Sequence, residues 1–144
     1  TIDCLITDHA PHSAEEKAKG LDGSAFGIVG LETAFAAAYT MLVKTGKLSF
    51  QRLIQCLCVN PRRIFGIPGA ITLATEVREP GAEYREGILE GALADLTALD
   101  LNESYRIDSS SFQSMGRSTL FDGAEVTGRI KGRWVGGERV YPFQ

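Results

Sequence analysis

Three side chains near the start of the sequence could bind a metal ion or transfer a proton. Asp8 is followed by His9 and His12, and these two histidines are the only ones in the chain. Carboxylates and imidazoles are common zinc ligands, and both also serve as general acids and bases. The spacing therefore predicts a metal-binding or acid–base site in this segment.

The sequence on either side of this cluster favours a functional site. Residues 2–6 are a short apolar run typical of a buried strand, so the cluster follows the carboxyl end of that strand. In barrels and open α/β sheets, active sites are built at that end. Downstream, residues 26–30 read Phe-Gly-Ile-Val-Gly and open a helix, whose backbone N–H groups could bind an anionic ligand. We expect these groups to share one face.

A simpler interpretation stays open at this point. Asp-His pairs also arise by chance, and Asp8 could begin a turn that Pro11 continues, with no chemical role. Residue types alone do not separate the two interpretations, because a short motif gains meaning from its structural context.

Several motifs resemble those of the class I dihydroorotases, which are zinc-dependent members of the amidohydrolase superfamily. They are Thr-Asp-His-Ala-Pro-His (7–12), Glu-Glu-Lys (15–17), Phe-Gly-Ile-Val-Gly-Leu-Glu-Thr (26–33), Val-Asn-Pro-Arg-Arg-Ile-Phe-Gly (59–66) and Gly-Ala-Leu-Ala-Asp-Leu (91–96). Hydantoinases and allantoinases keep the Asp-His pair but usually differ in the residues after it. Ala25 and Leu120 stand where the family generally has proline. We expect the first change to loosen a loop and the second to alter a turn.

The resemblance implies an α/β fold in two parts. Residues 1–67 would be the last strand, the substrate loop and the helices of a (β/α)8 barrel of the metal-dependent hydrolase type. Residues 68–144 would be the C-terminal part of a small β-sandwich. The implied enzyme interconverts N-carbamoyl-L-aspartate and L-dihydroorotate in de novo pyrimidine biosynthesis, using two zinc ions that activate a water molecule.

The resemblance also implies a role for each site residue. Asp8 would bind one zinc and act as general base and then general acid. His12 would contact the substrate carboxylate, and the backbone of Phe26 and Gly27 would bind the same substrate. His9 would orient Asp8 or the loop rather than bind metal. The family's remaining ligands are an His-x-His pair, a carboxylated lysine and two further histidines from earlier strands. Since none is in this sequence, we expect the chain alone to be inactive.

Two other functions stay open. The chain could belong to a non-catalytic dihydroorotase-like partner of aspartate transcarbamoylase, or to a hydantoinase- or allantoinase-type cyclic amidohydrolase. The presence together of Asp8, His12, Phe26 and Gly27 favours the dihydroorotase. A homodimer or a complex with aspartate transcarbamoylase is the assembly that the resemblance suggests.

Composition excludes several other classes of protein. Hydrophobic residues make up 44% and charged residues 23%, as in globular domains. A net charge of −3 without a basic run argues against general nucleic-acid binding, and no apolar stretch is long enough to span a membrane. Three cysteines in apolar segments, Cys4, Cys56 and Cys58, predict buried free thiols in a reducing compartment, the cytoplasm.

Periodicity and turn residues predict the remaining elements. Residues 30–43 have helical spacing ended by Gly46, and Ser49 caps a second helix over 50–59 that Asn60-Pro61 should stop. Strand signals follow residue 68, with breaks at 80–81, 87 and 91, a strand at 94–100, a polar loop at 109–118 and a hairpin turn at 135–138.

Overall fold

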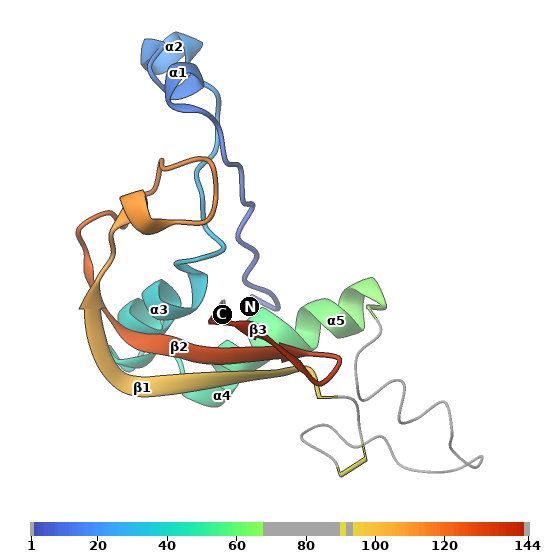
Figure 1. The fold of residues 1–144 in the computed structure, drawn as a ribbon. Coiled ribbons are helices and arrows are strands. Elements are labelled where there is room, and N and C mark those ends of the chain that lie inside the picture. Colours follow the sequence, from blue (N-terminus) through green and yellow to red (C-terminus); the bar gives the residue numbers. More distant parts are fainter. Residues whose placement is uncertain (1, 68–89, 92–93, 143–144) are drawn as a thin grey trace.

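The computed structural model describes residues 2–67, 90–91 and 94–142, and within them helices pack against one antiparallel sheet (Figure 1). The sheet has the order β1-β2-β3, with β1 at Leu96–Arg106, β2 at Glu125–Val135 and β3 at Glu138–Tyr141. The expected strand at 94–100 is confirmed in β1, which is longer. The expected hairpin turn is also confirmed, because Gly136 and Gly137 link β2 to β3 with φ of 60° and 88°.

Both predicted helices are present. The first runs through α3 (Ala34–Ala38) and the π-helical η1 (Tyr39–Val43), and Gly46 follows it with φ of 73°. The second begins with α4 (Phe50–Ile54), where the Ser49 hydroxyl accepts the N–H of Arg52 at 3.2 Å as an N-cap.

The predicted stop at Asn60-Pro61 is wrong. The second helix continues through the π-helical η2 (Gln55–Val59) into α5 (Asn60–Phe65) and ends at Gly66, which is left-handed. A proline inside an α-helix lacks one N–H and collides with the carbonyl four residues earlier. The wider π turn directly before Pro61 changes this local geometry, as π-bulges do.

The expected strand at residues 2–6 forms no β-ladder within the described part of the chain. Its backbone instead bonds to the second helix: the N–H of Leu5 donates to the carbonyl of Cys56 at 3.0 Å. Side chains of that helix complete the contact, since Arg52 donates to the carbonyl of Ile2 and Asn60 to that of Asp3, both at 2.8 Å. A strand needs a neighbouring strand to share its hydrogen bonds, and here a helix takes that place on one side.

A small lobe of two one-turn helices, α1 (Ala14–Lys17) and α2 (Gly20–Gly23), protrudes at the top of Figure 1. Ser13 and Glu16 form a reciprocal capping box at the start of α1. The ammonium of Lys17 closes the lobe by donating to the carbonyls of Ala25 (2.8 Å) and Gly27 (2.9 Å). The N–H of Ala25 donates to the carbonyl of Glu16 at 3.2 Å, a bond that a proline could not make. Ala25 therefore ties the loop to α1 instead of loosening it.

The core lies where the first helix crosses β2. Its buried members come from the helix, the sheet and the loops between them: Val29, Ala36, Ile107, Phe112 and Val126. The hydroxyl of Thr40 accepts the N–H of Thr127 at 2.8 Å and donates to its carbonyl at 3.3 Å. Gly128 follows with φ of 99°, and a Cβ there would lie 3.0–3.1 Å from the rings of Tyr39 and Phe35. The crossing is thus too close for any larger residue.

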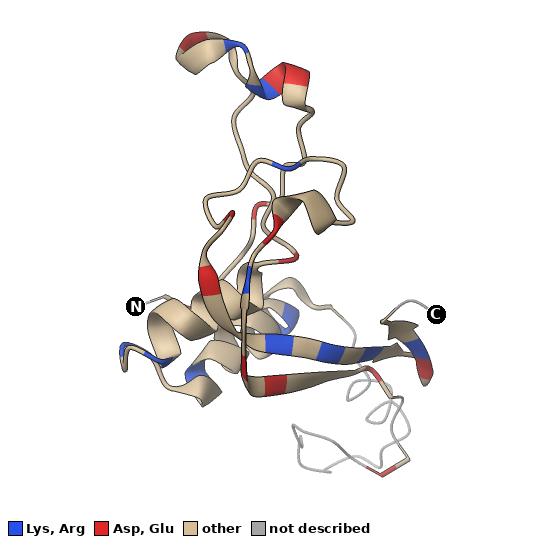
Figure 2. Ribbon diagram, turned by 60° about the vertical axis from the view of Figure 1, so that its left-hand side comes forward, with Lys and Arg blue, Asp and Glu red and all other residues tan. Residues whose placement is uncertain are grey.

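Charged side chains also lie on the sheet, and Figure 2 shows basic residues recurring along β2. Glu103 of β1 pairs with Arg129 at 2.6 Å and with Lys131 at 2.8 Å. Partly exposed ion pairs of this kind add little stability.

The remaining predictions have mixed outcomes. The polar loop at 109–118 is confirmed, apart from one 3-10 turn, η3 (Ser109–Ser111). Cys56 is a buried free thiol as expected, Cys4 is partly buried, and Cys58 is exposed because it lies two residues along the helix from Cys56. The boundary at residue 68 and the breaks at 80–81 and 87 lie outside the described residues. None of the helices that the structure describes is long and apolar enough to cross a bilayer.

The helix–sheet crossing predicts a large cost for a side chain at Gly128. We expect Gly128→Ala to lower the free energy of unfolding by about 1–3 kcal/mol more than Gly123→Ala, because only the first adds overpacking to backbone strain. Gly123 is a matched control: its φ is 72°, and a Cβ added there would meet no atom within 4 Å. Urea denaturation of the three proteins measures the difference, and equal losses would contradict the crossing.

The lobe should loosen when its ammonium is removed. In Lys17→Met, which keeps the apolar stem, we expect hydrogen exchange at the Ala25 amide to accelerate about tenfold, the usual size of an effect from losing hydrogen bonds to a charged group. Lys19→Met is the control, since Lys19 makes no hydrogen bond to the described residues. Unchanged exchange in Lys17→Met would show that the ammonium does not hold the loop.

Candidate active site

The two predicted site segments lie side by side. The N–H of Ala10 donates to the carbonyl of Ile28 at 2.9 Å, so residues 7–12 run along residues 26–30. Glycines allow this approach: a Cβ on Gly27 would lie 2.4 Å from the Cβ of Ala10, and one on Gly30 would lie 3.1 Å from the carbonyl oxygen of Thr7. The structure therefore brings the Asp-His cluster against the Phe-Gly loop.

Asp8 has a strained backbone conformation. Its φ is 45°, in the left-handed region that non-glycine residues seldom adopt. Its side chain is exposed, and no described residue donates a hydrogen bond to the carboxylate or pairs with it. Such strain persists only where surrounding contacts hold it, and it is common in active sites. Asp8 therefore presents an exposed, unpaired carboxylate on a strained backbone position.

His12 faces the same loop. A Cβ on Gly27 would lie 3.7 Å from its Nε2 atom, while its Nδ1 atom is 3.7 Å from a carboxylate oxygen of Glu16. The Ser13 amide donates to that carboxylate at 2.8 Å, and this bond, together with the nearby Ser13 hydroxyl, lowers the pKa of Glu16 below its ordinary value. Gly116 packs on the other side, where a Cβ would lie 2.7 Å from Pro11. The ring of His12 thus lies between the Glu16 carboxylate and the Gly27 loop, and Gly116 packs on the backbone of Pro11 and His12.

Phe26 and Gly27 offer backbone rather than side chains. The Phe26 side chain is 91% exposed, and the N–H groups of Phe26 and Gly27 donate to no acceptor among the residues described. Two free donors beside His12 could bind a carboxylate oxygen.

The anion-binding function expected for the rest of this loop is wrong for its last residues. The N–H groups of Gly30 and Leu31 donate to Nδ1 of His9, at 3.1 and 3.3 Å. The N–H of Val29 donates to the carbonyl of Ser118 at 2.9 Å. Because these donors are already used within the protein, they are not available to a ligand. His9 orients the loop, as predicted for one of its two possible roles.

The described residues do not form a metal site by themselves. In the ranges that the structure covers, no three His, Cys, Asp or Glu side chains come close enough to hold a metal ion together. The exposed carboxylate of Asp8 has the chemistry of one ligand, whereas zinc sites use three or four. His9 and His12 have partners of their own, so they do not complete the set.

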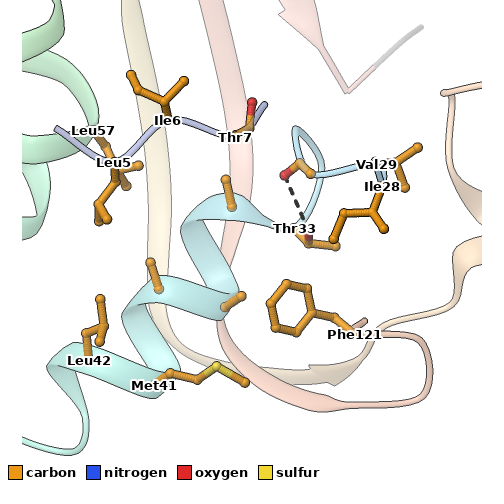
Figure 3. A pocket seen from close by; sticks show the side chains of 14 residues that line it. Leu5, Ile6, Thr7, Ile28, Val29, Thr33, Met41, Leu42, Leu57 and Phe121 are labelled. Atoms are coloured by element: carbon orange, nitrogen blue, oxygen red, sulfur yellow. Dashed lines mark hydrogen bonds between the residues drawn. The ribbon is translucent and has the colours of Figure 1, made fainter. Parts of the chain in front are cut away.

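An apolar pocket of about 300 Å³ lies behind the site segment (Figure 3). Leu5 and Ile6 line it from the N-terminal segment, Met41 and Leu42 from the first helix, and Phe121 from the loop before β2. Neither Asp8 nor His12 borders it. A charged substrate would lose hydration there without finding polar partners, so this pocket is a packing surface rather than the place of the chemistry.

The sequence does not predict the roles of three residues near the site. Lys17 closes the loop, Glu32 accepts the amides of Gln113 (2.9 Å) and Ser114 (3.1 Å), and the Ser114 hydroxyl lies 3.4 Å from Nε2 of His9. Glu32 lies inside a recognised motif, but its partner is more than eighty residues away. Ser114 sits in a polar loop with no periodic signal, so no local pattern indicates it.

Known proteins similar to this chain include dihydroorotases and an L-hydantoinase. No family model matches the sequence. The dihydroorotase of Brevibacillus brevis is 44% identical over 142 residues, and that of Macrococcus caseolyticus is 39% identical over 141 residues. Each alignment covers 98% of this chain, but only 29% and 30% of the relatives. Among solved structures, the L-hydantoinase (dihydropyrimidinase) of Arthrobacter aurescens has a TM-score of 0.77 at 32% identity, covering 96% of this chain and 28% of that one.

Sequence and fold thus agree on one superfamily. The structural similarity to the hydantoinase fits the amidohydrolase superfamily. The similar sequences are dihydroorotases, and they align with nearly the whole chain. The chain is therefore related to the dihydroorotases, and it spans about 30% of the length of the curated relatives that it matches.

Proposed function

We propose that this chain is the C-terminal part of a dihydroorotase, which closes and hydrolyses the cyclic amide of L-dihydroorotate. The observation that carries the proposal is the identity of about 40% to dihydroorotases over 98% of the chain. That span includes the segment in which Asp8, His12 and the Phe26-Gly27 loop lie together. Because the matched relatives are more than three times as long, the proposed activity belongs to the longer protein.

The same proposal assigns the two parts of the chain. Residues 1–67 would contribute the last strand, the substrate loop and the helices of a (β/α)8 barrel, and residues 68–144 part of a β-sandwich. Apolar surface on the first part supports this: Ile2 is 69% exposed, and Ile6 (64%) and Met41 (47%) border the apolar pocket. Burying it against earlier barrel strands would contribute about 25 cal/mol per Å².

Asp8 is the proposed acid–base residue and zinc ligand. Two zinc ions, when bound, would activate the attacking water and polarise the ring carbonyl. The Asp8 carboxylate would take the proton of that water and deliver it to the ring nitrogen as the C–N bond breaks. Its exposed, unpaired state and its backbone-fixed orientation suit both tasks. The other zinc ligands would come from residues outside this chain.

The substrate carboxylate is proposed to lie between His12 and the Phe26-Gly27 backbone. An imidazole N–H and two amide N–H groups are the donors that a carboxylate accepts in proteins. Lys17 holds the carbonyl of Ala25, and because a trans peptide unit directs its N–H opposite to its carbonyl, the free N–H of Phe26 points away from the Lys17 ammonium, toward the proposed substrate. These contacts would hold the ring while Asp8 acts on it.

A second candidate is a hydantoinase- or allantoinase-type amidohydrolase, because the solved relative with 32% identity is an L-hydantoinase. A non-catalytic dihydroorotase-like partner of aspartate transcarbamoylase is a third. Assays of the full-length protein with dihydroorotate, hydantoin and allantoin separate all three, since the last would turn over none of them. Assembly as a homodimer or with the transcarbamoylase, and a cytoplasmic location, are further expectations from the family resemblance.

The role of Asp8 predicts a specific loss. In the full-length enzyme, Asp8→Asn should keep the fold and lower kcat at least about a hundredfold, because an amide neither accepts the proton nor binds zinc as an anion. Asp22→Asn, on the exposed α2, is the control for a lost surface carboxylate. Near-normal turnover in Asp8→Asn would remove Asp8 from the mechanism.

The role of His12 predicts a different pattern. His12→Ala should leave the zinc content unchanged and weaken transition-state binding by about 1.5–3 kcal/mol, the usual worth of a hydrogen bond to a charged group. The loss should appear chiefly in KM. Metal analysis and steady-state kinetics measure both, with Glu16→Gln as a control that removes only the carboxylate beside Nδ1. Zinc lost together with activity would make His12 a ligand instead.

A further inference from the structure

His9 is held in a single tautomer by the backbone. Its Nδ1 atom accepts the N–H groups of both Gly30 (3.1 Å) and Leu31 (3.3 Å). A nitrogen that accepts two donors carries no proton, so the proton of the neutral ring is on Nε2. The ring thereby joins the segment after Asp8 to the start of the first helix, and its other nitrogen acts as a donor.

A serine and a glutamate continue this chain of hydrogen bonds. Nε2 of His9 lies 3.4 Å from the Ser114 hydroxyl, which in turn donates to Glu32 at 2.8 Å. All donors point the same way, from the Gly30 and Leu31 amides through His9 and Ser114 to the carboxylate. A directed series of this kind polarises each bond in it.

Glu32 is itself firmly held. Burial works against its charge, but the amides of Gln113 and Ser114, the Ser114 hydroxyl and the nearby Arg117 together lower the pKa of this carboxyl below its ordinary value. Arg117 also donates to the carbonyls of Phe112 (2.6 Å) and Ser114 and so fixes the loop that carries the serine. The hydrogen-bond series therefore ends on an ionised and anchored group.

The series acts directly beside Asp8. The imidazole belongs to His9, which directly follows Asp8, and its bond to Gly30 anchors that residue. Gly30 also packs closely against the carbonyl of Thr7, the residue before Asp8. The left-handed conformation of Asp8 is held from both sides by the same loop. Releasing His9 would free one of these two supports.

We propose that Ser114 and Glu32 are positioning residues that act through His9 to hold the Asp8 carboxylate in its working orientation. Neither touches the substrate or the reacting atoms. The proposal rests on the proposed function only for its kinetic consequence, because the hydrogen-bond series is a property of this chain alone.

The first test needs no catalysis. Nitrogen-15 NMR of His9 in the full-length protein should show a protonated Nε2 and an unprotonated Nδ1. In Ser114→Ala we expect hydrogen exchange at the Gly30 and Leu31 amides to accelerate about tenfold, as loss of a partly buried hydrogen-bond partner does. The control is Ser111→Ala, whose hydroxyl donates only to the carbonyl of Asp108. A proton on Nδ1, or equal exchange in both variants, would overturn the series.

The second test uses the full-length enzyme. Ser114→Ala and Glu32→Gln should each lower kcat about 10–100-fold, as loss of outer partners of catalytic groups does, with KM changed less than about twofold. Ser114→Thr, which keeps the hydroxyl, should restore most of kcat, and Ser111→Ala should leave it unchanged. A purely structural role would instead lower Tm without this kcat-selective loss, and that result would overturn the proposal.

The two proposals fail in different ways. If Asp8→Asn retains full turnover, the proposed function fails, while the tautomer of His9 and the exchange of the loop amides still test the series. If Asp8→Asn abolishes turnover and both Ser114→Ala and Glu32→Gln keep normal kcat, the positioning inference alone is wrong. Glu32→Gln provides the kinetic result even if Ser114→Ala does not fold.

Discussion

The pair of hydrogen bonds between Thr40 and the backbone of Thr127 is the contact on which the rest of the structure depends. One hydroxyl both accepts from and donates to the same residue of β2, in the way a neighbouring strand would. It brings the first helix so close to the sheet that only glycine fits at position 128. Since unpaired backbone groups are costly in a protein interior, this pairing determines where the helix lies.

The position of the site segment, residues 7–12, depends on that helix. The helix begins at Ala34, after the turn that follows Gly30, and the amides of Gly30 and Leu31 bind His9, which follows Asp8. The sheet contributes from the other side, because the loop between β1 and β2 carries Ser114 to the same imidazole. The backbone of Asp8 is thus positioned by two parts of the chain that are far apart in sequence, although its carboxylate forms no hydrogen bond or ion pair with either.

Local sequence signals predict those features that depend on a few neighbouring residues. The Gly136-Gly137 turn, the Ser49 cap and the Asp8-His12 cluster each follow from short-range chemistry, and the structure has the first two as expected. Features that depend on distant contacts were missed. The run at residues 2–6 has strand composition but bonds to a helix, and Ser114 gains its role only through the fold. Pro61 does not end the second helix as expected, because a π turn directly before it changes the local helix geometry.

The continuation of the second helix past Pro61 has a consequence for the N-terminal segment. If the helix ended there, Asn60 would not lie in line with Arg52, and the carbonyls of Ile2 and Asp3 would lose their donors. With both donors in place, the second helix bonds to the carbonyls of Ile2 and Asp3 and to the N–H of Leu5, while the backbone groups of Cys4 and Ile6, which leave part of one edge open, have no partner within the described chain. Fixing a residue's backbone costs about 1–2 kcal/mol of conformational entropy. The contacts with the second helix already order residues 2–6. A strand that pairs with the open edge would therefore lose less conformational entropy than one that pairs with a disordered segment.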